Sequence, residues 1–225
     1  FEPSMVLTCS NIGINILRVY VIDKAGNSDY CEVQLDLQDP NKVCPTGLTI
    51  TGKFTTIKGG PVAGVTAIWE RANPAGTNAT YSDKTGAFAF NNITPGMDYT
   101  LRAEKTNGQY VNGVSTYDIV LIQKHILGIQ LFDSPYKFLA ADVNASCGIT
   151  AADIAEIRKL ILGTISKFDK TPSWNFIPVA SAMPNPVQPC GFVNSITYNL
   201  INRNETSADF YGIKMGDINI DVDAG

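Results

Sequence analysis

The chain has 225 residues, of which 44% are hydrophobic and 17% are charged, and its formal net charge is −4. This length accommodates two domains or three small ones, and the composition excludes a chain that is disordered throughout. The acidic balance argues against nucleic-acid binding, which needs clustered Lys and Arg, and no apolar run is long enough to span a membrane.

The first segment, residues 1–39, begins without an initiator Met and without the zones of a signal peptide, which indicates a mature chain or a fragment. Its apolar residues alternate in "NILRVYVIDKAGNSDYCEVQLDLQD", and the turn cluster "DKAGNSD" divides that run. The pattern predicts a β-hairpin. About three strands cannot close a sandwich, so we expect the missing strands upstream or in another chain.

The pattern "V.D.AGN...C" in this hairpin resembles the closing half of an immunoglobulin-like repeat of the hyalin type, which is common in bacterial surface proteins. The resemblance implies that residues 1–39 are the C-terminal part of an Ig-like β domain. The stretch "DPNKVCPTG" that follows is typical of a linker.

Residues 46–105 form a second block, with strand-like runs about every ten residues separated by Gly, Pro or Asp. The stretches "ITGK", "GGPVAGV", "DKTGAFAF" and "PGMDYTLR" resemble the carboxypeptidase regulatory-like, transthyretin-like fold. The resemblance implies a small β-sandwich that serves as a rigid spacer.

The third block, residues 106–225, changes to a helical period. Both "STYDIVLIQKHILG" and "TAADIAEIRKLILG" place isoleucines at i, i+3 and i+7. The two segments superpose at an offset of 35 residues with eight identities in sixteen positions, which indicates an internal duplication. The identical pairs are Gly113/Gly148, Asp118/Asp153, Ile119/Ile154, Ile122/Ile157, Lys124/Lys159, Ile126/Ile161, Leu127/Leu162 and Gly128/Gly163.

The stretch "DVNASCGITAAD" runs from Asp142 into the second of these helices. It has side-chain oxygens at positions one, three and five, a carbonyl at seven, Thr150 at nine to hold a water, and a carboxylate at twelve. Those are the ligand positions of an EF-hand, in which Ca²⁺ binds oxygens at about 2.3–2.6 Å. The alternative is a metal-free helix N-cap preceded by an Asn/Ser turn. The candidate calcium ligands are Asp142, Asn144, Ser146, Gly148 and Asp153.

Paired loop-helix units of this kind build dockerin modules, and residues 107–165 resemble a divergent dockerin. The family pattern has Asp at position five and Gly at position six, whereas this chain has Ser146 and Cys147. Only two carboxylates remain, so we expect a weak Kd of about 10⁻⁴ to 10⁻³ M. The resemblance also assigns a partner-facing role to Gln123, Lys124, Arg158 and Lys159.

The first copy of the loop offers fewer ligands, because Val111 stands at position five. Two interpretations stay open: the loop is metal-free and held by packing, or another segment supplies the missing carboxylate. The tail "GDINIDVDAG" is either that segment, through Asp217, Asn219 or Asp221, or a solvated acidic terminus. The candidate ligands of a second Ca²⁺ are Asn107, Gln109, Gly113 and Asp118.

The five cysteines form no CxxC or Cys/His cluster, which favours disulfides over a thiolate metal site and indicates an oxidising, extracellular setting. We expect Cys9 to pair with Cys31 across the first block. Cys147 stands where the loop needs a left-handed backbone, at a cost of about 1–2 kcal/mol, and we expect Cys190 to hold it there; two unpaired thiols are the alternative. Cys44 is left free or pairs outside the chain.

The sequence offers no catalytic constellation: His125 is the only histidine and there is no nucleophile–base pair or phosphate-binding glycine loop. We therefore expect a mainly β, multidomain, non-catalytic region of a secreted bacterial surface, filament or adhesin protein. Ig-like sandwich modules would precede a calcium-stabilised dockerin-like unit that serves structure or assembly, with protein partners or self-assembly through strand edges or the dockerin-like face.

The alternative is a docking module of a secreted multidomain enzyme that binds a cohesin-like partner. A docking module would leave the partner-facing residues Gln123, Lys124, Arg158 and Lys159 exposed, whereas a structural joint would bury them against residues 168–200.

Overall fold

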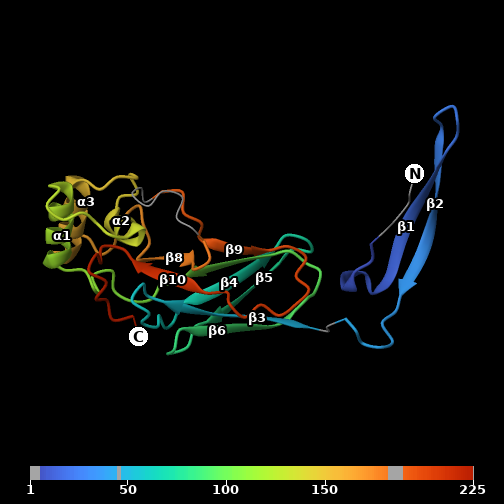
Figure 1. Cartoon of the computed structure of the whole chain (residues 1–225), viewed down its shortest axis with the longest axis horizontal. Helices are drawn as coiled ribbons and strands as arrows, with labels where there is room; N and C mark the ends of the chain where they lie inside the picture. Colours follow the sequence, from blue (N-terminus) through green and yellow to red (C-terminus); the bar gives the residue numbers. More distant parts are fainter. Residues whose placement is uncertain (1–5, 45–46, 182–189, 225) are drawn as a thin grey trace.

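The computed structural model describes residues 6–44, 47–181 and 190–224, and it is mainly β with three short α-helices in that part of the chain. The strands form one hairpin and two four-stranded sheets, and the helices lie together at one end of the sheets (Figure 1). The strands are β1 Gly13–Ile22, β2 Ser28–Leu37, β3 Leu48–Thr55, β4 Thr66–Arg71, β5 Gly76–Tyr81, β6 Ala87–Ile93, β7 Tyr99–Glu104, β8 Trp174–Pro178, β9 Ser195–Tyr198 and β10 Phe210–Lys214. The helices are α1 Thr116–Ile126, α2 Pro135–Ala141 and α3 Ala151–Ile161, and a 3₁₀ turn spans Cys9–Asn11.

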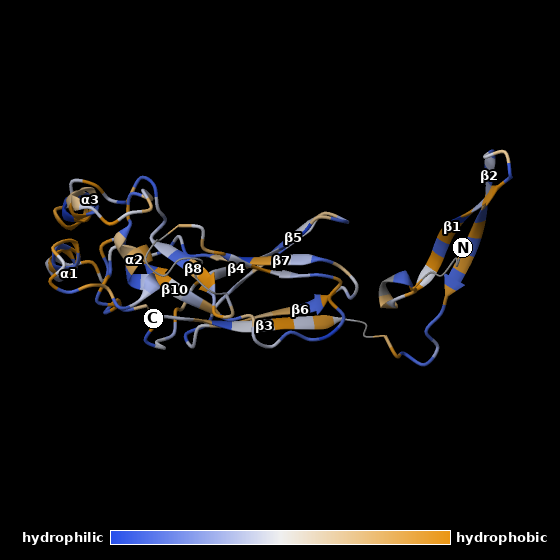
Figure 2. Ribbon diagram, turned by 45° about the horizontal axis from the view of Figure 1, so that its top comes forward, coloured by the Kyte–Doolittle hydropathy of each residue, from blue (hydrophilic) through white to orange (hydrophobic). Residues whose placement is uncertain are grey.

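The predicted N-terminal hairpin is present as β1 and β2, which pair antiparallel over their whole length. In Figure 2 the two strands are banded with apolar and polar residues, as the alternating sequence requires. Apolar side chains nevertheless face solvent, and Ile14 and Ile16 are 67% and 68% exposed. No strand in the described ranges joins this hairpin to either sheet.

The predicted Cys9–Cys31 bridge is wrong, because the structure joins Cys9 to Cys44 and leaves Cys31 as an exposed thiol. The register of the hairpin explains the difference. Cys31 lies in the middle of β2, opposite Val19, whereas Cys9 precedes β1 and therefore lies at the open end of the hairpin. The chain leaves β2 at that same end, which brings Cys44 to Cys9.

The two four-stranded sheets pack face to face, with strand orders β6-β3-β10-β8 and β5-β4-β7-β9. Strand β3 shows why: its apolar residues alternate, and Leu48, Ile50 and Phe54 all point into the core. From the facing sheet, Tyr99 and Leu101 pack into the same cluster. The expected β-sandwich is therefore present.

The sandwich extends beyond its predicted C-terminal boundary at residue 105, and that boundary is wrong. Strand β10 lies between β3 and β8 and pairs parallel with β3, while β9 pairs with β7. Three strands of the predicted third block thus complete the sheets of the second. The helical unit, residues 107–165, is inserted between β7 and β8 of one sandwich.

The helices α1 and α3 have the same local design, as the duplication requires. Ile122 and Ile157 are fully buried between them, whereas Ile126, predicted to share that stripe, is largely exposed. His125, at the end of α1, stacks on Phe132 with ring centroids 4.1 Å apart, so it packs against a neighbouring ring.

Helix α2 was not expected from the sequence; Ser134 caps its N-terminus, and Pro135 occupies its first turn.

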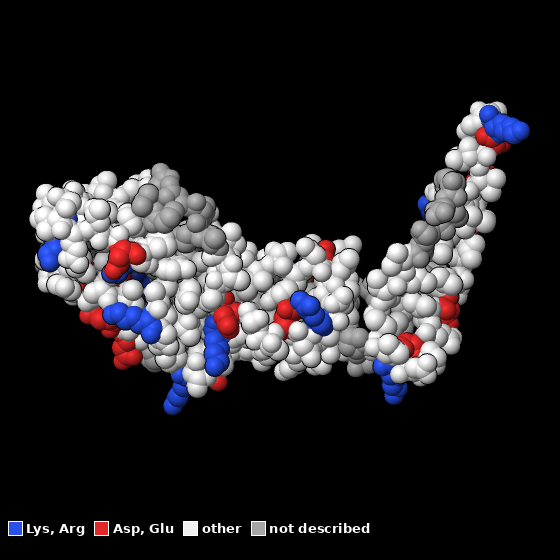
Figure 3. Space-filling model, viewed as in Figure 1, with Lys and Arg blue, Asp and Glu red and all other residues white. Residues whose placement is uncertain are grey.

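Charged residues of both signs are mixed on the face that Figure 3 shows, where Lys and Arg are interspersed with Asp and Glu. Among the described residues, no helix is long and apolar enough to cross a membrane.

Candidate metal centre

The predicted calcium loop connects α2 to α3 and is fixed at both ends by helix caps. Asp142 is the C-cap residue of α2, and its N–H donates to the Phe138 carbonyl. At the other end, Thr150 caps α3 and forms a capping box with Asp153, three residues later. The two helix caps therefore place the first and last predicted ligands at the two ends of the loop.

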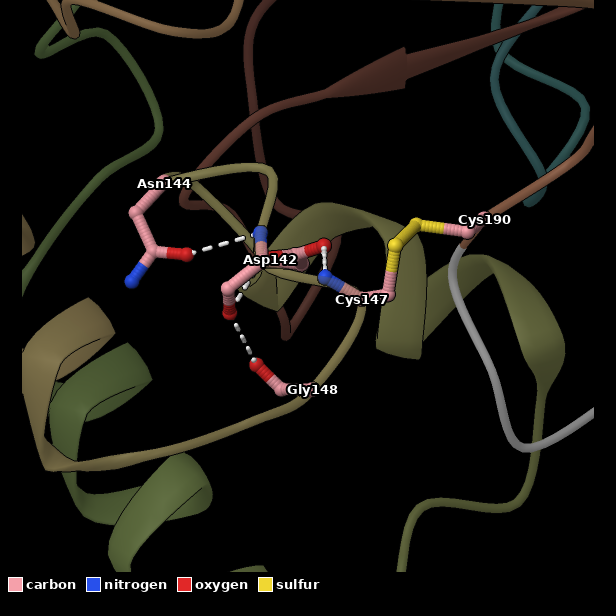
Figure 4. The surroundings of a disulfide bond; sticks show 6 residues. Asp142, Asn144, Cys147, Gly148 and Cys190 are labelled. Carbon is pink, nitrogen blue, oxygen red and sulfur yellow. Dashed lines mark hydrogen bonds between the residues drawn. A yellow bond between two sulfur atoms is a disulfide. The ribbon is translucent and has the colours of Figure 1, made fainter.

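The buried carboxylate of Asp142 accepts hydrogen bonds from the backbone of its own loop. Its two oxygens accept hydrogen bonds from the backbone N–H groups of Ser146 (2.9 Å) and Cys147 (3.0 Å). The Ser146 N–H also donates to Asn144 Oδ1 (2.9 Å), and the Ser146 hydroxyl donates to the Gly148 carbonyl (3.1 Å). In Figure 4, Asp142 lies between Asn144 and the disulfide. Four of the five predicted ligands are thus within one hydrogen-bonded turn.

Asp153, the fifth predicted ligand, is 0% exposed, and only one of its two carboxylate oxygens accepts hydrogen bonds. Its Oδ2 accepts hydrogen bonds from the N–H and the hydroxyl of Thr150, at 2.9 and 3.2 Å. Its Oδ1 is buried and has no hydrogen-bond partner. Burial, and to a lesser degree the negative charge of Asp142, raise the pKa of Asp153 above its ordinary value. Hydrogen bonds from Thr150 oppose this rise in pKa, as does a weaker effect of the Asn144 backbone, which does not form a hydrogen bond to Oδ1. A metal-free cap accounts for Oδ2 and leaves Oδ1 unexplained.

The donor set suits a hard cation. A buried carboxylate oxygen without a donor costs about 1–3 kcal/mol or more, and a cation would satisfy it. The oxygens gathered around Asp142 and Asp153 are carboxylate, amide, hydroxyl and carbonyl, which Ca²⁺ accepts in flexible geometry. No group of three His, Cys, Asp or Glu side chains in the described ranges is arranged to hold a metal. A cation here would therefore depend on the Asn144, Ser146 and Gly148 oxygens as well as on two carboxylates.

The disulfide Cys147–Cys190 is the pair that the sequence predicts. Cys147 has the expected left-handed backbone, with φ of 65°, and Ala145 two residues earlier has φ of 53°. The bridge closes a separation of 43 residues and contributes about 4 kcal/mol in the loop-entropy model. It fastens the loop to the segment that leads into β9.

The first copy of the loop is built differently. Asp118 is fully buried and forms the same capping box with Ser115 as Asp153 forms with Thr150. The structure does not bring Asn107 or Gln109 to it: the amide of Asn107 lies beside Gly64, and the Gln109 carbonyl accepts from Asn112 N–H in a local turn.

Asp118 Oδ1 instead accepts hydrogen bonds from the tail, from the N–H groups of Ile218 (2.7 Å) and Asn219 (3.1 Å). Gly113, the remaining predicted ligand, packs against Val222 of the same tail.

The tail is therefore not a solvated acidic terminus. Asp217 is 2% exposed, and burial, with added repulsion from Asp118 and Asp221, raises the pKa of its carboxyl to about 6. The sequence signal for this role was the spacing Asp217, Asn219, Asp221, which repeats the spacing of Asp142, Asn144 and Ser146.

The face assigned to a partner is open rather than covered. Gln123, Arg158 and Lys159 are exposed and Lys124 is half-buried. Next to them, Leu127 and Leu162, which occupy equivalent positions in the two repeats, are 71% and 70% exposed. Within the described parts of 168–200, residues 168–181 and 190–200, no segment buries this face in the way that a structural joint would require.

Comparison of the chain with known protein families finds no family model that matches it, and comparison with curated proteins finds no significant relative.

Proposed function

We propose that this chain is a non-catalytic region of a secreted bacterial surface or filament protein, in which bound Ca²⁺ stabilises a dockerin-like helical unit on the end of a β-sandwich. The observation that carries the proposal is the buried, partnerless Oδ1 of Asp153, at the twelfth position of a loop whose other oxygens surround Asp142. Two disulfides fit an extracellular setting.

Calcium would stabilise the fold by binding the closed loop and not the unfolded chain. The loop lies between α2 and α3, and residues of both helices pack in one cluster with Ile177 of β8 and Ile213 of β10. Tightening the loop therefore stabilises the junction of helices and sheets. At free Ca²⁺ of about 100 times Kd, the gain in the free energy of unfolding is about 2.7 kcal/mol.

The test is thermal unfolding of the chelator-treated protein with and without added Ca²⁺. We expect Ca²⁺ to raise the Tm and a chelator to reverse the rise. Asp153→Asn keeps an acceptor for the Thr150 cap but removes the charge, so it should reduce the calcium-dependent rise. Asp133→Asn is the matched control, because Asp133 is an exposed partner of Lys137 in the same unit. An unchanged Tm on chelation of the wild-type protein contradicts the proposal.

A second candidate function is a docking module that binds a cohesin-like partner, and the open face around Arg158 and Lys159 favours it. The exposed pair Leu127 and Leu162 gives that face an apolar centre with basic residues beside it. Calorimetry with purified cohesin-type domains tests this function. Binding that requires Ca²⁺ and is lost in Arg158→Glu/Lys159→Glu, but not in Lys84→Glu on the sandwich surface, would support it.

A further inference from the structure

We propose that the helical unit has a second Ca²⁺ site, made of the tail residues 217–222 and the first helix, in which a calcium loop is split between two segments about a hundred residues apart. This inference rests on the proposed function, because it takes the loop at Asp142–Asp153 as the pattern. Residues 217–222 would supply positions one to six, and residues 113–118 would supply positions seven to twelve.

The tail repeats the hydrogen bonds of the contiguous loop. Asp217 accepts from the N–H groups four and five residues later: Asp221 N–H donates to Oδ1 (3.2 Å) and Val222 N–H donates to Oδ2 (3.1 Å). Asp142 accepts from Ser146 and Cys147 at the same two spacings. Asp217 is therefore equivalent to position one.

The backbone takes the same left-handed turn at position four, although Val222 at position six is not left-handed as Cys147 is. Ile220 is left-handed with φ of 56°, as Ala145 is at the equivalent fourth position with φ of 53°. After Val222 the tail meets Gly113, where a Cβ would lie 2.8 Å from the Val222 Cα. Gly113 is the repeat equivalent of Gly148, the seventh position of the contiguous loop. Position six of the tail thus lies against position seven of the first repeat, although no peptide bond joins them.

Asp118 closes this split loop as Asp153 closes the contiguous one. Its Oδ2 accepts from the N–H and hydroxyl of Ser115, at 2.8 and 2.9 Å, and its Oδ1 holds the tail through Ile218 and Asn219. Asp118 already accepts four hydrogen bonds, so its main roles are to position the tail and to add negative charge. It can contact the ion directly if the Ser115 hydroxyl rotates away.

An unsatisfied oxygen lies at position three of the split site. Asn219 Oδ1 is buried and has no hydrogen-bond partner. The same residue donates its backbone N–H to Asp118 and its side-chain Nδ2 to Asp221 Oδ2 (2.7 Å), so Asn219 is hydrogen-bonded to two carboxylates of the site. The only other buried side-chain polar atom without a partner in the described ranges is Asp153 Oδ1. Each loop therefore has one orphan oxygen at a predicted ligand position.

The split site carries more charge than the contiguous one. Its carboxylates are Asp118, Asp217 and Asp221, whereas the contiguous loop has only Asp142 and Asp153, with Ser146 at position five. Asp221 is exposed and bonded to Asn219, so it would have to turn toward Asp217 when the ion binds. Because carboxylate count sets the affinity of such loops, we infer that the split site binds Ca²⁺ at least about tenfold more tightly than the contiguous loop.

Calorimetric titration of the chelator-treated whole chain with Ca²⁺, together with native mass spectrometry to count bound ions, tests the inference. We expect two ions. Asp221→Ser gives the split loop the residue that the contiguous loop has at position five, and it should weaken the tighter site at least tenfold while the weaker site is unchanged. Asp153→Asn should remove only the weaker site, and Asp133→Asn should change neither.

The outcomes separate this inference from the proposed function. A single ion that is lost in Asp153→Asn and unaffected by Asp221→Ser overturns the split site and leaves the proposed function standing. A single ion that persists in Asp153→Asn and weakens in Asp221→Ser supports the split site and overturns the contiguous one. Two ions whose affinities do not respond to Asp221→Ser overturn the split site, and no bound ion overturns both.

Discussion

At the scale of single residues, the junction between the sandwich and the helical unit buries a basic group as well as acidic ones. Lys214, at the end of β10, is 3% exposed; its ammonium donates to the Tyr110 carbonyl and to the Ser173 hydroxyl (2.9 Å). Burial lowers the pKa of Lys214 to about 8, against a smaller opposing effect of the Asp217 charge. Lys214 therefore makes stability depend on pH in the alkaline range.

We predict that the free energy of unfolding rises as the pH is raised from about 8 to 10. Over this range the unfolded chain, in which the lysine pKa is 10.5, holds more protons than the folded chain. The slope contributed by Lys214 is at most about 1.4 kcal/mol per pH unit, and it fades below about pH 7, where both states are protonated. Urea unfolding at each pH measures it. Burial also lowers the pKa of Lys105, so Lys214→Met should remove most of the rise, while Lys84→Met, on the surface, should retain it.

The sequence identified single functional residues where a repeated or contiguous pattern marked them. Asp142 and Asp153 were identified because Asp153 aligns with Asp118 in the duplication and because the ligands of this loop follow one another in the chain. Lys214 was not identified, because nothing in "FYGIK" shows that the end of this strand is covered by residues 110 and 173. The pairing of Cys9 was predicted wrongly since distance along the chain does not give the register of a hairpin.

At the scale of elements, the sequence predicts those strands whose partners are near in the chain. Strands β3 to β7 alternate and are separated by turn residues, so they could be recognised. Strands β8, β9 and β10 are only 5, 4 and 5 residues long, and they lie between irregular stretches. Strand β10 pairs with β3 and β9 pairs with β7, each more than ninety residues earlier, and among the described strands β8 pairs only with β10. No local pattern encodes these pairings.

The closest packing of the sandwich lies where a late segment crosses an early strand. A Cβ on Gly52 in β3 would lie 2.1 Å from the Ala208 carbonyl oxygen, just before β10. We predict that Gly52→Ala lowers the free energy of unfolding by about 3 kcal/mol or more, because the backbone of residue 208 has to move. Gly76→Ala in β5 is the control, since its nearest contact would be an ordinary 3.5 Å. Equal stability of the two variants in urea unfolding would contradict the observed strand order.

At the scale of the whole molecule, the hairpin is the part whose stability is least explained by its own contacts. It exposes apolar residues and has two unpaired strand edges, and a lone two-stranded hairpin is marginal in water. The sequence predicted the hairpin and the need for further strands, and the described residues supply none of them. Strand addition by a neighbouring chain is one way to cover these edges.

We therefore predict that the chain self-associates through residues 6–44. Light scattering after size-exclusion chromatography should show a mass that rises with concentration toward at least twice 24.3 kDa. Removal of residues 1–44 should abolish this rise and leave the Tm of the sandwich unchanged. Even a weak association with a Kd of about 1 mM populates dimers at about millimolar concentration. A chain of 225 residues that stays monomeric up to that concentration would rule out the hairpin as an assembly surface.

The hydrogen bonds from the tail to Asp118 also determine when the helical unit can complete its packing during synthesis of the chain. The first helix is made long before residues 217–222, so Oδ1 of its buried Asp118 lacks its two backbone donors until residues 218 and 219 have emerged. The central strand β10 arrives only just before. A chain interrupted before residue 210 would lack both β10 and the tail, and it would stay open to proteolysis. The helical unit therefore reaches its final packing only after residues 217–222 have been made.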